Sequence, residues 1–232
     1  SKNLVAVEAL QQHENFNRKT FSLKHFLLDE TKTGIIAEFK RRSPSKGIIN
    51  DLADVLQVTT AYTNHGASCL SVLTDSNFFG GSADDLRKAR VNDTPILRKD
   101  FIIDEYQLVE ARSIGADVIL LIAACLTPAE VRRLAAFARS LQLEVLLEIH
   151  NEEQLEHIGD DIDIVGVNNR DLKFFSVDIN RSLELSEKIP AGKIKISESG
   201  ISDIAAIQRL KEAGFSGFLI GEKFMKEPDP AI

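Results

Sequence analysis

Charged side chains end several short apolar runs of the sequence, and these residues are the ones that could carry chemistry. In the stretch IIAEFK, Glu38 is followed two positions later by Lys40, and residues two apart on a strand point to the same side of a sheet. A carboxylate and an ammonium are costly to desolvate there unless they pair with each other or with a ligand. We interpret this pair as functional in preference to a purely structural ion pair.

Two further run ends carry groups suited to proton transfer. Lys99 follows the residues PILR, and its amine is a candidate general acid because neighbouring carboxylates would keep it protonated. The alternative is a solvated charge at a rim. Glu148 follows three apolar residues in VLLEIH and could serve as an acid or base, or form a salt bridge with Lys99 or Lys40. Both interpretations of Glu148 can hold, since a paired carboxylate can still exchange a proton.

The last three apolar runs are followed by an amide, an arginine, a carboxylate and glycine turns. An amide and a guanidinium fork suit a carboxylate or phosphate ligand, and glycine turns after the last strands of a barrel commonly hold a phosphate through backbone N–H groups. Turns also use glycine for conformational reasons alone. The residues at these run ends are Asn168, Arg170, Glu198, Ser199, Gly200, Gly221 and Glu222, and Gly200 and Gly221 stand where a phosphate is expected.

Metal and nucleotide motifs are not found in the sequence. The five histidines show no ligand-like spacing, no GxGxxG follows an apolar run, and no GxxxxGK[ST] occurs. We therefore expect no metal site and no cofactor. The histidines in question are His13, His25, His65, His150 and His157.

Eight apolar runs without polar alternation predict the strands that must position these groups. Segments of helical periodicity separate the runs, which is typical of a parallel sheet in one domain, and eight repeats favour closure. The predicted fold class is α/β, a single parallel (β/α)₈ barrel of the TIM type. The predicted strands are Gly34–Phe39, Ser68–Leu73, Pro95–Arg98, Val118–Ile122, Val145–Ile149, Ile164–Val167, Lys193–Ile196 and Gly217–Ile220.

Two outer helices have clear boundaries in the sequence. Residues 128–141 form one, with Thr127 as N-cap and a proline at the first position. Residues 202–213 form the other, with Ser202 as cap and an apolar stripe of Ile204, Ile207 and Leu210.

The whole chain, 1–232, is predicted to be one domain. Residues 1–33 lie outside the strand–helix alternation and are expected to form a helical extension that covers an end of the barrel. Residues 34–232 form the barrel, with a last outer helix that is short or truncated.

Composition limits the partners of the chain. Lys and Arg total 28 against 35 Asp and Glu, and the net charge of −7 disfavours binding to nucleic acid or an anionic membrane. No apolar stretch is long enough for a membrane helix, and the N-terminus lacks a secretory signal pattern. We expect a cytoplasmic monomer, with Cys69 and Cys125 as buried free thiols.

Seven motifs in order closely resemble the indole-3-glycerol phosphate synthase family of tryptophan biosynthesis. The resemblance covers about residues 34–225, whereas residues 1–33 match only the latter part of the family's longer N-terminal extension. The motifs are EFKRRSPSKG, LTDSNFFGGS, ILRKDF, LLEIH, VGVNNRDL, ISESGI and FLIGE.

The resemblance implies a carboxy-lyase that closes the ring of 1-(2-carboxyphenylamino)-1-deoxyribulose 5-phosphate with loss of CO₂ and water. Lys99 would be the general acid, with Phe101 packing against the substrate. Glu148 and Glu38 would serve the dehydration, with the acid and the base not assigned between them, and Lys40 would hold the substrate carboxylate. The remaining polar shell would be Asn168, Arg170 and Glu198, and the substrate and phosphate pocket would be Ser43, Ser199, Gly200, Gly221 and Glu222.

Two other functions are weighed against the synthase. A related phosphosugar isomerase, such as phosphoribosylanthranilate isomerase, would not carry this set of lysines and glutamates. A non-catalytic phosphometabolite-binding barrel would keep the phosphate glycines but could lose Lys99 or Glu148, and both are present. The expected partner is a small phosphorylated substrate, and an association with other tryptophan-pathway enzymes is left open.

Overall fold

The computed structural model describes residues 5–171, 174, 176–227 and 229–230. The first four residues of the predicted N-terminal extension and the last two residues of the chain therefore lie outside the described residues.

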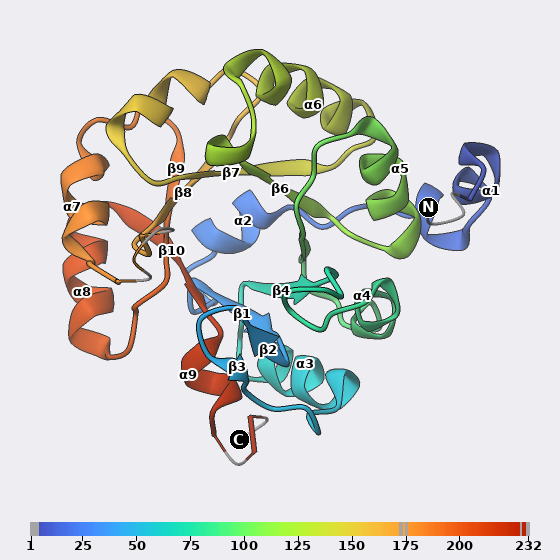
Figure 1. Ribbon diagram of the computed structural model, residues 1–232, viewed down its shortest axis with the longest axis horizontal. Helices are drawn as coiled ribbons and strands as arrows, with labels where there is room; N and C mark the ends of the chain where they lie inside the picture. The colour runs from blue at the N-terminus through green and yellow to red at the C-terminus, as the bar shows by residue number, and fades with distance from the viewer. Residues whose placement is uncertain (1–4, 172–173, 175, 228, 231–232) are drawn as a thin grey trace.

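A closed barrel of parallel strands dominates the part of the chain that the structure describes (Figure 1). Neighbouring strands follow the chain order of the barrel elements, and the last strand, β10, pairs with β1 to close the ring. Every predicted strand is present, with ends shifted by two residues at most, so the predicted fold class is confirmed. The strands are β1 (Ile35–Phe39), β4 (Cys69–Leu73), β5 (Ile96–Lys99), β6 (Val118–Ile122), β7 (Glu144–Ile149), β8 (Ile164–Asn168), β9 (Ile194–Glu198) and β10 (Phe215–Ile220).

Alternation along each strand divides its side chains between two cores. One core fills the barrel interior, and the other lies between the strands and the surrounding helices. Four strands place an ionisable residue two positions after an interior apolar residue, which directs that residue to the inside of the barrel mouth. These interior pairs are Ile36 with Glu38, Leu97 with Lys99, Leu146 with Glu148, and Ile196 with Glu198.

Helices surround the strands on the outside of the barrel (Figure 1). Their own end residues fix several of the boundaries; in α6, for example, Thr127 and Glu130 form a reciprocal capping box. The helices that follow the strands are α3 (Val55–Asn64), α4 (Ala83–Ala89), α5 (Glu105–Ile114), α6 (Pro128–Ser140), α7 (Asn180–Ser186), α8 (Ile204–Glu212) and α9 (Glu222–Met225), with 3₁₀ turns η2 (Ala123–Cys125) and η3 (Glu152–His157).

The start of α8 differs from the predicted helix over residues 202–213. Asp203, not Ser202, is the N-cap, because its carboxylate accepts a hydrogen bond from the Ala206 amide and the Ser202 hydroxyl points to Asp203 instead. Ile204 is 73% exposed, so its predicted place in the apolar stripe is wrong. A carboxylate competes well with a hydroxyl for this position, which explains the shift.

The predicted helical extension contains α1 (Val7–Gln11), η1 (Glu14–Asn17) and α2 (Leu23–Leu28). Helix α2 lies within the ring of strands in the view of Figure 1, and its residues Leu23 and Leu27 belong to the interior core. The extension therefore covers one opening of the barrel.

A buried carboxylate fastens this extension to the start of β6. Asp117, which is fully buried, contacts Arg18 Nη2 at 2.7 Å and Arg90 Nη1 at 2.5 Å. It also accepts hydrogen bonds from the backbone amides of Phe21 and Ile96. The clamp lies at the strand starts, the end of the barrel opposite the predicted site.

Three smaller features complete the fold. Cys69 is buried as predicted, but Cys125 is exposed because it follows the end of β6 in η2, so its predicted burial is wrong. A short hairpin of β2 (Arg42–Ser43) and β3 (Gly47–Ile48) follows β1 and was not predicted. None of the described helices is long and apolar enough to cross a membrane.

Candidate active site

A cavity of about 590 Å³ opens at the carboxyl ends of the barrel strands, a size typical of sites for small molecules. The structure brings all of the sequence-predicted site residues together around it. These lining residues are Glu38, Lys40, Ser43, Lys99, Phe101, Glu148, Asn168, Arg170, Glu198, Ser199, Gly200, Gly221 and Glu222.

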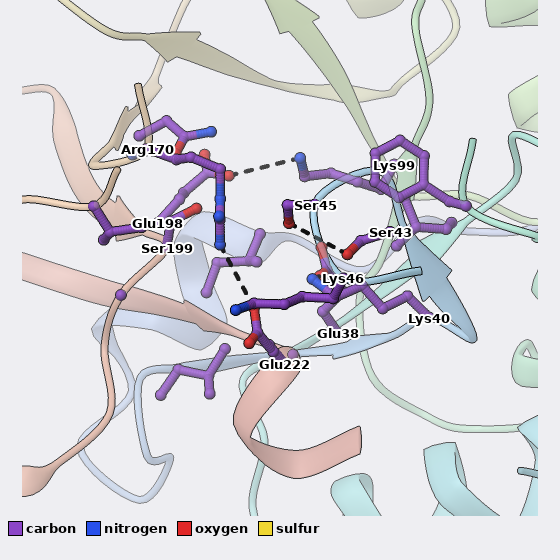
Figure 2. A pocket seen from close by; sticks show the side chains of 18 of the residues that line it. Glu38, Lys40, Ser43, Ser45, Lys46, Lys99, Arg170, Glu198, Ser199 and Glu222 are labelled. Atoms are coloured by element: carbon purple, nitrogen blue, oxygen red, sulfur yellow. Dashed lines mark hydrogen bonds and ion pairs between the residues drawn. The ribbon is translucent and has the colours of Figure 1, made fainter. Parts of the chain in front are cut away.

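Lys99 lies between two carboxylates at the centre of the cavity. Its Nζ is 3.3 Å from Oε2 of Glu148 and 3.8 Å from Oε2 of Glu198, and the second contact crosses the mouth in Figure 2. Burial alone would lower the pKa of Lys99, but Glu148, followed by the carboxyl groups of Glu198 and Glu38, outweighs it and raises that pKa. The amine is therefore held as an ammonium, the form that can donate a proton.

Glu148 is ionised, although it is almost completely buried. Burial opposes ionisation, but the charge of Lys99 and the hydrogen bond from the amide of Asn168 lower the pKa of Glu148. Asn168 Nδ2 donates to Oε1 of Glu148 at 3.0 Å, and the Arg170 amide donates to Oδ1 of Asn168, which fixes the orientation of that side chain. The arrangement holds a carboxylate ready to accept a proton.

Glu198 has the opposite ionisation. It is 1% exposed, and burial together with the charge of Glu148 raises the pKa of Glu198 to about 8, against the opposing charge of Lys99. Its Oε1 has no hydrogen-bond partner among the described residues. Neighbouring carboxyl groups whose environments push their pKa values apart are typical of acid–base sites.

Glu38 and Lys40 form a close ion pair at the end of β1, with Nζ to Oε1 at 2.6 Å. Gly221 leaves the space for this carboxylate, because a Cβ at position 221 would lie 2.6 Å from Oε1 of Glu38. The pair is thus both a structural ion pair and part of the cavity wall.

The turn after β9 has a strained backbone. Ser199 has a φ of 70°, a value that non-glycine residues adopt at a cost of about 1 kcal/mol or more, and Gly200 follows with a φ of 73°. Buried Asn169 holds this turn, since its Nδ2 donates to the carbonyl of Ser199 at 3.0 Å and to Oγ of Ser197 at 2.9 Å. Strain maintained by a buried amide at a cavity wall points to a ligand-binding turn.

Cations gather beside this turn, around the carboxylate of Glu222. Arg170 Nη2 lies 3.5 Å from Oε2 of Glu222, and Lys226 Nζ lies 2.6 Å from its Oε1. In Figure 2 the side chains of Arg170 and Lys46 approach Glu222 from different sides. Burial opposes the effect, but Lys226, followed by Lys46 and Lys40, lowers the pKa of Glu222. A protein of net charge −7 thus concentrates positive charge locally at one wall of the cavity.

Aromatic rings form the wall near Lys99. Phe101 is 42% exposed, and its ring lies edge-on to Phe78 at 6.2 Å and tilted against Phe79 at 6.5 Å between centroids. Such a surface offers an apolar platform to a flat ligand.

A protein-family model described as "Indole-3-glycerol phosphate synthase" matches residues 1–232. The chain belongs to the indole-3-glycerol phosphate synthase family. This confirms the resemblance seen in the motifs and identifies the chain as a lyase of tryptophan biosynthesis.

Similar proteins of the same name support the membership of this chain in the indole-3-glycerol phosphate synthase family. The protein from Bacteroides thetaiotaomicron is 50% identical over 230 residues, which are 99% of this chain and 88% of that protein. The protein from a Polaromonas species is 47% identical over 203 residues, which are 87% of this chain and 77% of the relative.

Solved structures with low identity show the barrel fold alone. An N-acetylmannosamine-6-phosphate 2-epimerase from Clostridium perfringens has a TM-score of 0.65 at 14% identity, over 89% of this chain and 93% of the other. A tryptophan synthase complex from Pyrococcus furiosus has a TM-score of 0.61 at 14% identity, over 84% and 90%.

Several residues in or beside this synthase-family cavity were missed by sequence reasoning. Ser45 and Lys46 come from the unpredicted hairpin between β2 and β3, and Lys226 comes from beyond the last strand. His150 was dismissed for lack of metal-ligand spacing, although its position two residues after Glu148 already placed it on the same side of the strand. Asn169, which holds the turn after β9, was not predicted to support the site.

Among the described residues, no group of three or more His, Cys, Asp or Glu side chains is arranged to hold a metal ion. The expectation that this family member needs neither metal nor cofactor stays a prediction.

Proposed function

We propose that this chain catalyses the decarboxylative, dehydrative ring closure of 1-(2-carboxyphenylamino)-1-deoxyribulose 5-phosphate to indole-3-glycerol phosphate. One observation carries the proposal: the amine of Lys99 lies in one cavity between the carboxyl groups of Glu148, 3.3 Å away, and Glu198, 3.8 Å away. Their surroundings raise the pKa of Lys99, lower the pKa of Glu148 and raise the pKa of Glu198 to about 8. The reaction needs an acid at a carbonyl, an acid at a departing hydroxyl, and a base, and this cluster supplies both kinds of group.

In the first step, the ring carbon that bears the carboxylate attacks the sugar carbonyl, and a carbon–carbon bond forms. The oxygen of that carbonyl gains electron density and takes a proton from the ammonium of Lys99. The nearby carboxylates favour the charged form of Lys99, so the proton is available at neutral pH. Phe101 supports the aromatic ring of the substrate during the attack.

Loss of CO₂ follows, with the electrons of the breaking bond returning to the ring system. Lys40 pairs with the substrate carboxylate before it leaves, and Glu38 keeps the ammonium in place at 2.6 Å. In the final step the hydroxyl departs as water with a proton from an acid, while a base removes a proton from the new ring. The ionised state of Glu148 supports it as the base, and the protonated state of Glu198 supports it as a donor in the same cluster.

The phosphate of the substrate is assigned to the opposite wall of the cavity. Backbone N–H groups near Gly200 and Gly221 and the hydroxyls of Ser43 and Ser199 are its proposed ligands, with Arg170 as the nearest guanidinium. Glu222 repels a phosphate through its side chain, so any contact from that residue would use its backbone amide.

The purified protein should convert the carboxyphenylamino-deoxyribulose phosphate to a product with indole fluorescence, with no metal or nucleotide added. A folded sample that binds the substrate but gives no fluorescence would overturn the proposal and favour a binding barrel. Formation of a different sugar phosphate without loss of CO₂ would overturn it in favour of an isomerase.

A further inference from the structure

His150 contacts Glu148 but is not among the residues that line the cavity. It follows β7 two residues after Glu148, is 9% exposed, and places Nε2 3.3 Å from Oε1 of Glu148. The proposed mechanism uses no atom of this ring.

The ring of His150 has no hydrogen-bond partner for either nitrogen among the described residues. His157, another buried histidine, shows the usual arrangement: its Nε2 lies 2.9 Å from the carbonyl of Leu126 and its Nδ1 lies 3.2 Å from the carbonyl of Gln154. Buried polar groups that stay unsatisfied are costly and rare, so each one calls for an explanation. The carboxylate that the proposed mechanism uses as its base lies 3.3 Å from Nε2 of His150.

The charged and polar groups that face His150 come from three directions. Glu148 favours the cationic ring, as does the side chain of Gln154, whose Oε1 accepts a hydrogen bond from the backbone amide of His150, while Arg181 of α7 and Lys99 of β5 disfavour it. Burial is the largest influence, and the net effect lowers the pKa of His150. The ring is therefore neutral near pH 7, with a single N–H to donate.

The two oxygens of Glu148 have different neighbours. Oε1 faces Asn168 Nδ2 at 3.0 Å and His150 Nε2 at 3.3 Å, whereas Oε2 faces Lys99 Nζ. If Asn168 and His150 both donate to Oε1, Oε2 is the oxygen left for the reacting atoms. At 3.3 Å, Nε2 of His150 and Oε1 of Glu148 are close enough for a hydrogen bond.

We propose that His150 is a positioning residue whose neutral ring donates from Nε2 to Oε1 of Glu148 and thereby reserves Oε2 for proton exchange. The inference rests on the proposed function, because it assumes that Glu148 acts on the substrate. This role differs from a purely structural one because it requires a hydrogen-bond donor at the position of Nε2, beside Oε1 of Glu148.

Two substitutions separate the donor from the volume of the ring. In His150→Gln the amide nitrogen can occupy the place of Nε2, whereas in His150→Asn it occupies the place of Nδ1, beyond reach of Glu148. We expect His150→Asn to lower kcat about ten- to hundredfold with KM changed less than about threefold, the loss typical of a hydrogen bond to a charged group. His150→Gln should recover most of kcat. Equal kcat in the two variants, or an effect on KM alone, would overturn the proposal.

His157→Asn is the matched control, since it removes a buried imidazole that does not contact Glu148. It should lower the thermal stability of the protein and leave kcat and its pH profile unchanged. A loss of kcat equal to that of His150→Asn would show that any buried histidine matters equally, and would overturn the proposal.

The tautomer of His150 gives a test that needs no activity. In ¹⁵N NMR of the wild-type protein at pH 7, we expect the proton on Nε2 and a shift of that signal in Glu148→Gln. A proton on Nδ1, or a signal insensitive to Glu148→Gln, would overturn the inference even if the synthase assay succeeds. A correct tautomer with no ring closure would instead count against the proposed function alone.

Discussion

Gly166 and Glu198 fit together so closely that a side chain at position 166 would displace the carboxyl group of Glu198, since a Cβ there would lie 2.2 Å from Oε1 of Glu198. The glycine is on β8 and the glutamate is at the end of β9, and their strands are paired in the barrel. The missing side chain is what allows the carboxyl of Glu198 to sit inside the barrel beside Lys99.

Gly166→Ala should displace Glu198 and lower kcat by about ten- to hundredfold, because a shift of 1 Å at a reacting group can have that effect. Overpacking should also lower the free energy of unfolding by about 1–3 kcal/mol. The control is Gly159→Ala, whose added Cβ would meet only Arg132 Cγ at 3.6 Å. Steady-state kinetics and urea unfolding measure both effects, and an unchanged kcat in Gly166→Ala would remove Glu198 from the mechanism.

Lys99→Ala should lower turnover by at least about 10²-fold, the usual contribution of a positioned general acid. The phosphorylated substrate should still bind, because the proposed phosphate ligands lie on the opposite wall. Single-turnover rates and a binding titration separate the two effects. Near-normal turnover would exclude Lys99 as the acid.

Glu198→Gln should change how stability depends on pH. The pKa of Glu198 is raised to about 8 in the folded protein by burial and by Glu148, against about 4.3 in an unfolded chain. Between pH 4.3 and pH 8, the folded protein therefore binds about one proton more than the unfolded chain. This proton binding stabilises the folded state fully below about pH 4.3, and the stabilisation is lost as the pH rises to about 8. The free energy of unfolding of Glu198→Gln, relative to that of wild type, should rise by on the order of a few kcal/mol from pH 5 to pH 8. Urea unfolding at pH 5 and pH 8 measures this change. If the difference in unfolding free energy between Glu198→Gln and wild type is the same at both pH values, the raised pKa of Glu198 is contradicted.

Asp117→Asn should weaken the fold without altering the chemistry. Asp117 is fully buried between Arg18 and Arg90, and breaking a buried ion pair typically costs about 3–5 kcal/mol. Glu105→Gln, which breaks an exposed pair with Arg133, should cost less than about 1 kcal/mol. Calorimetry gives the stabilities, and kcat at 25 °C should stay within about twofold of wild type in both variants. A large loss of kcat in folded Asp117→Asn would show that the clamp reaches the cavity.

The sequence predicts the barrel well because its signal is strong and local. Apolar runs such as Val118–Ile122 are buried on both faces, and parallel strands need no pattern more subtle than that. The convergence of Lys99 with Glu148 follows from the same logic, since charged residues that end parallel strands must meet at one end of a closed barrel.

Other features depend on contacts between distant residues, which sequence patterns do not reveal. The protonated state of Glu198 needs both its burial and the charge of Glu148, and neither can be deduced from ISESG. The unsatisfied ring of His150 becomes visible only when its neighbours are known. At the start of α8, Ser202 and Asp203 are both good caps, and the choice between them is made by the local geometry.

The Asp117 clamp and the cavity occupy opposite poles of the barrel. The contacts that hold the N-terminal extension are therefore far from the groups that transfer protons. Substitutions at the two ends of the barrel should have independent, additive effects. Directed evolution could therefore raise the thermal stability of the Asp117 end of the barrel while the cavity is independently redesigned for a different ring-forming substrate.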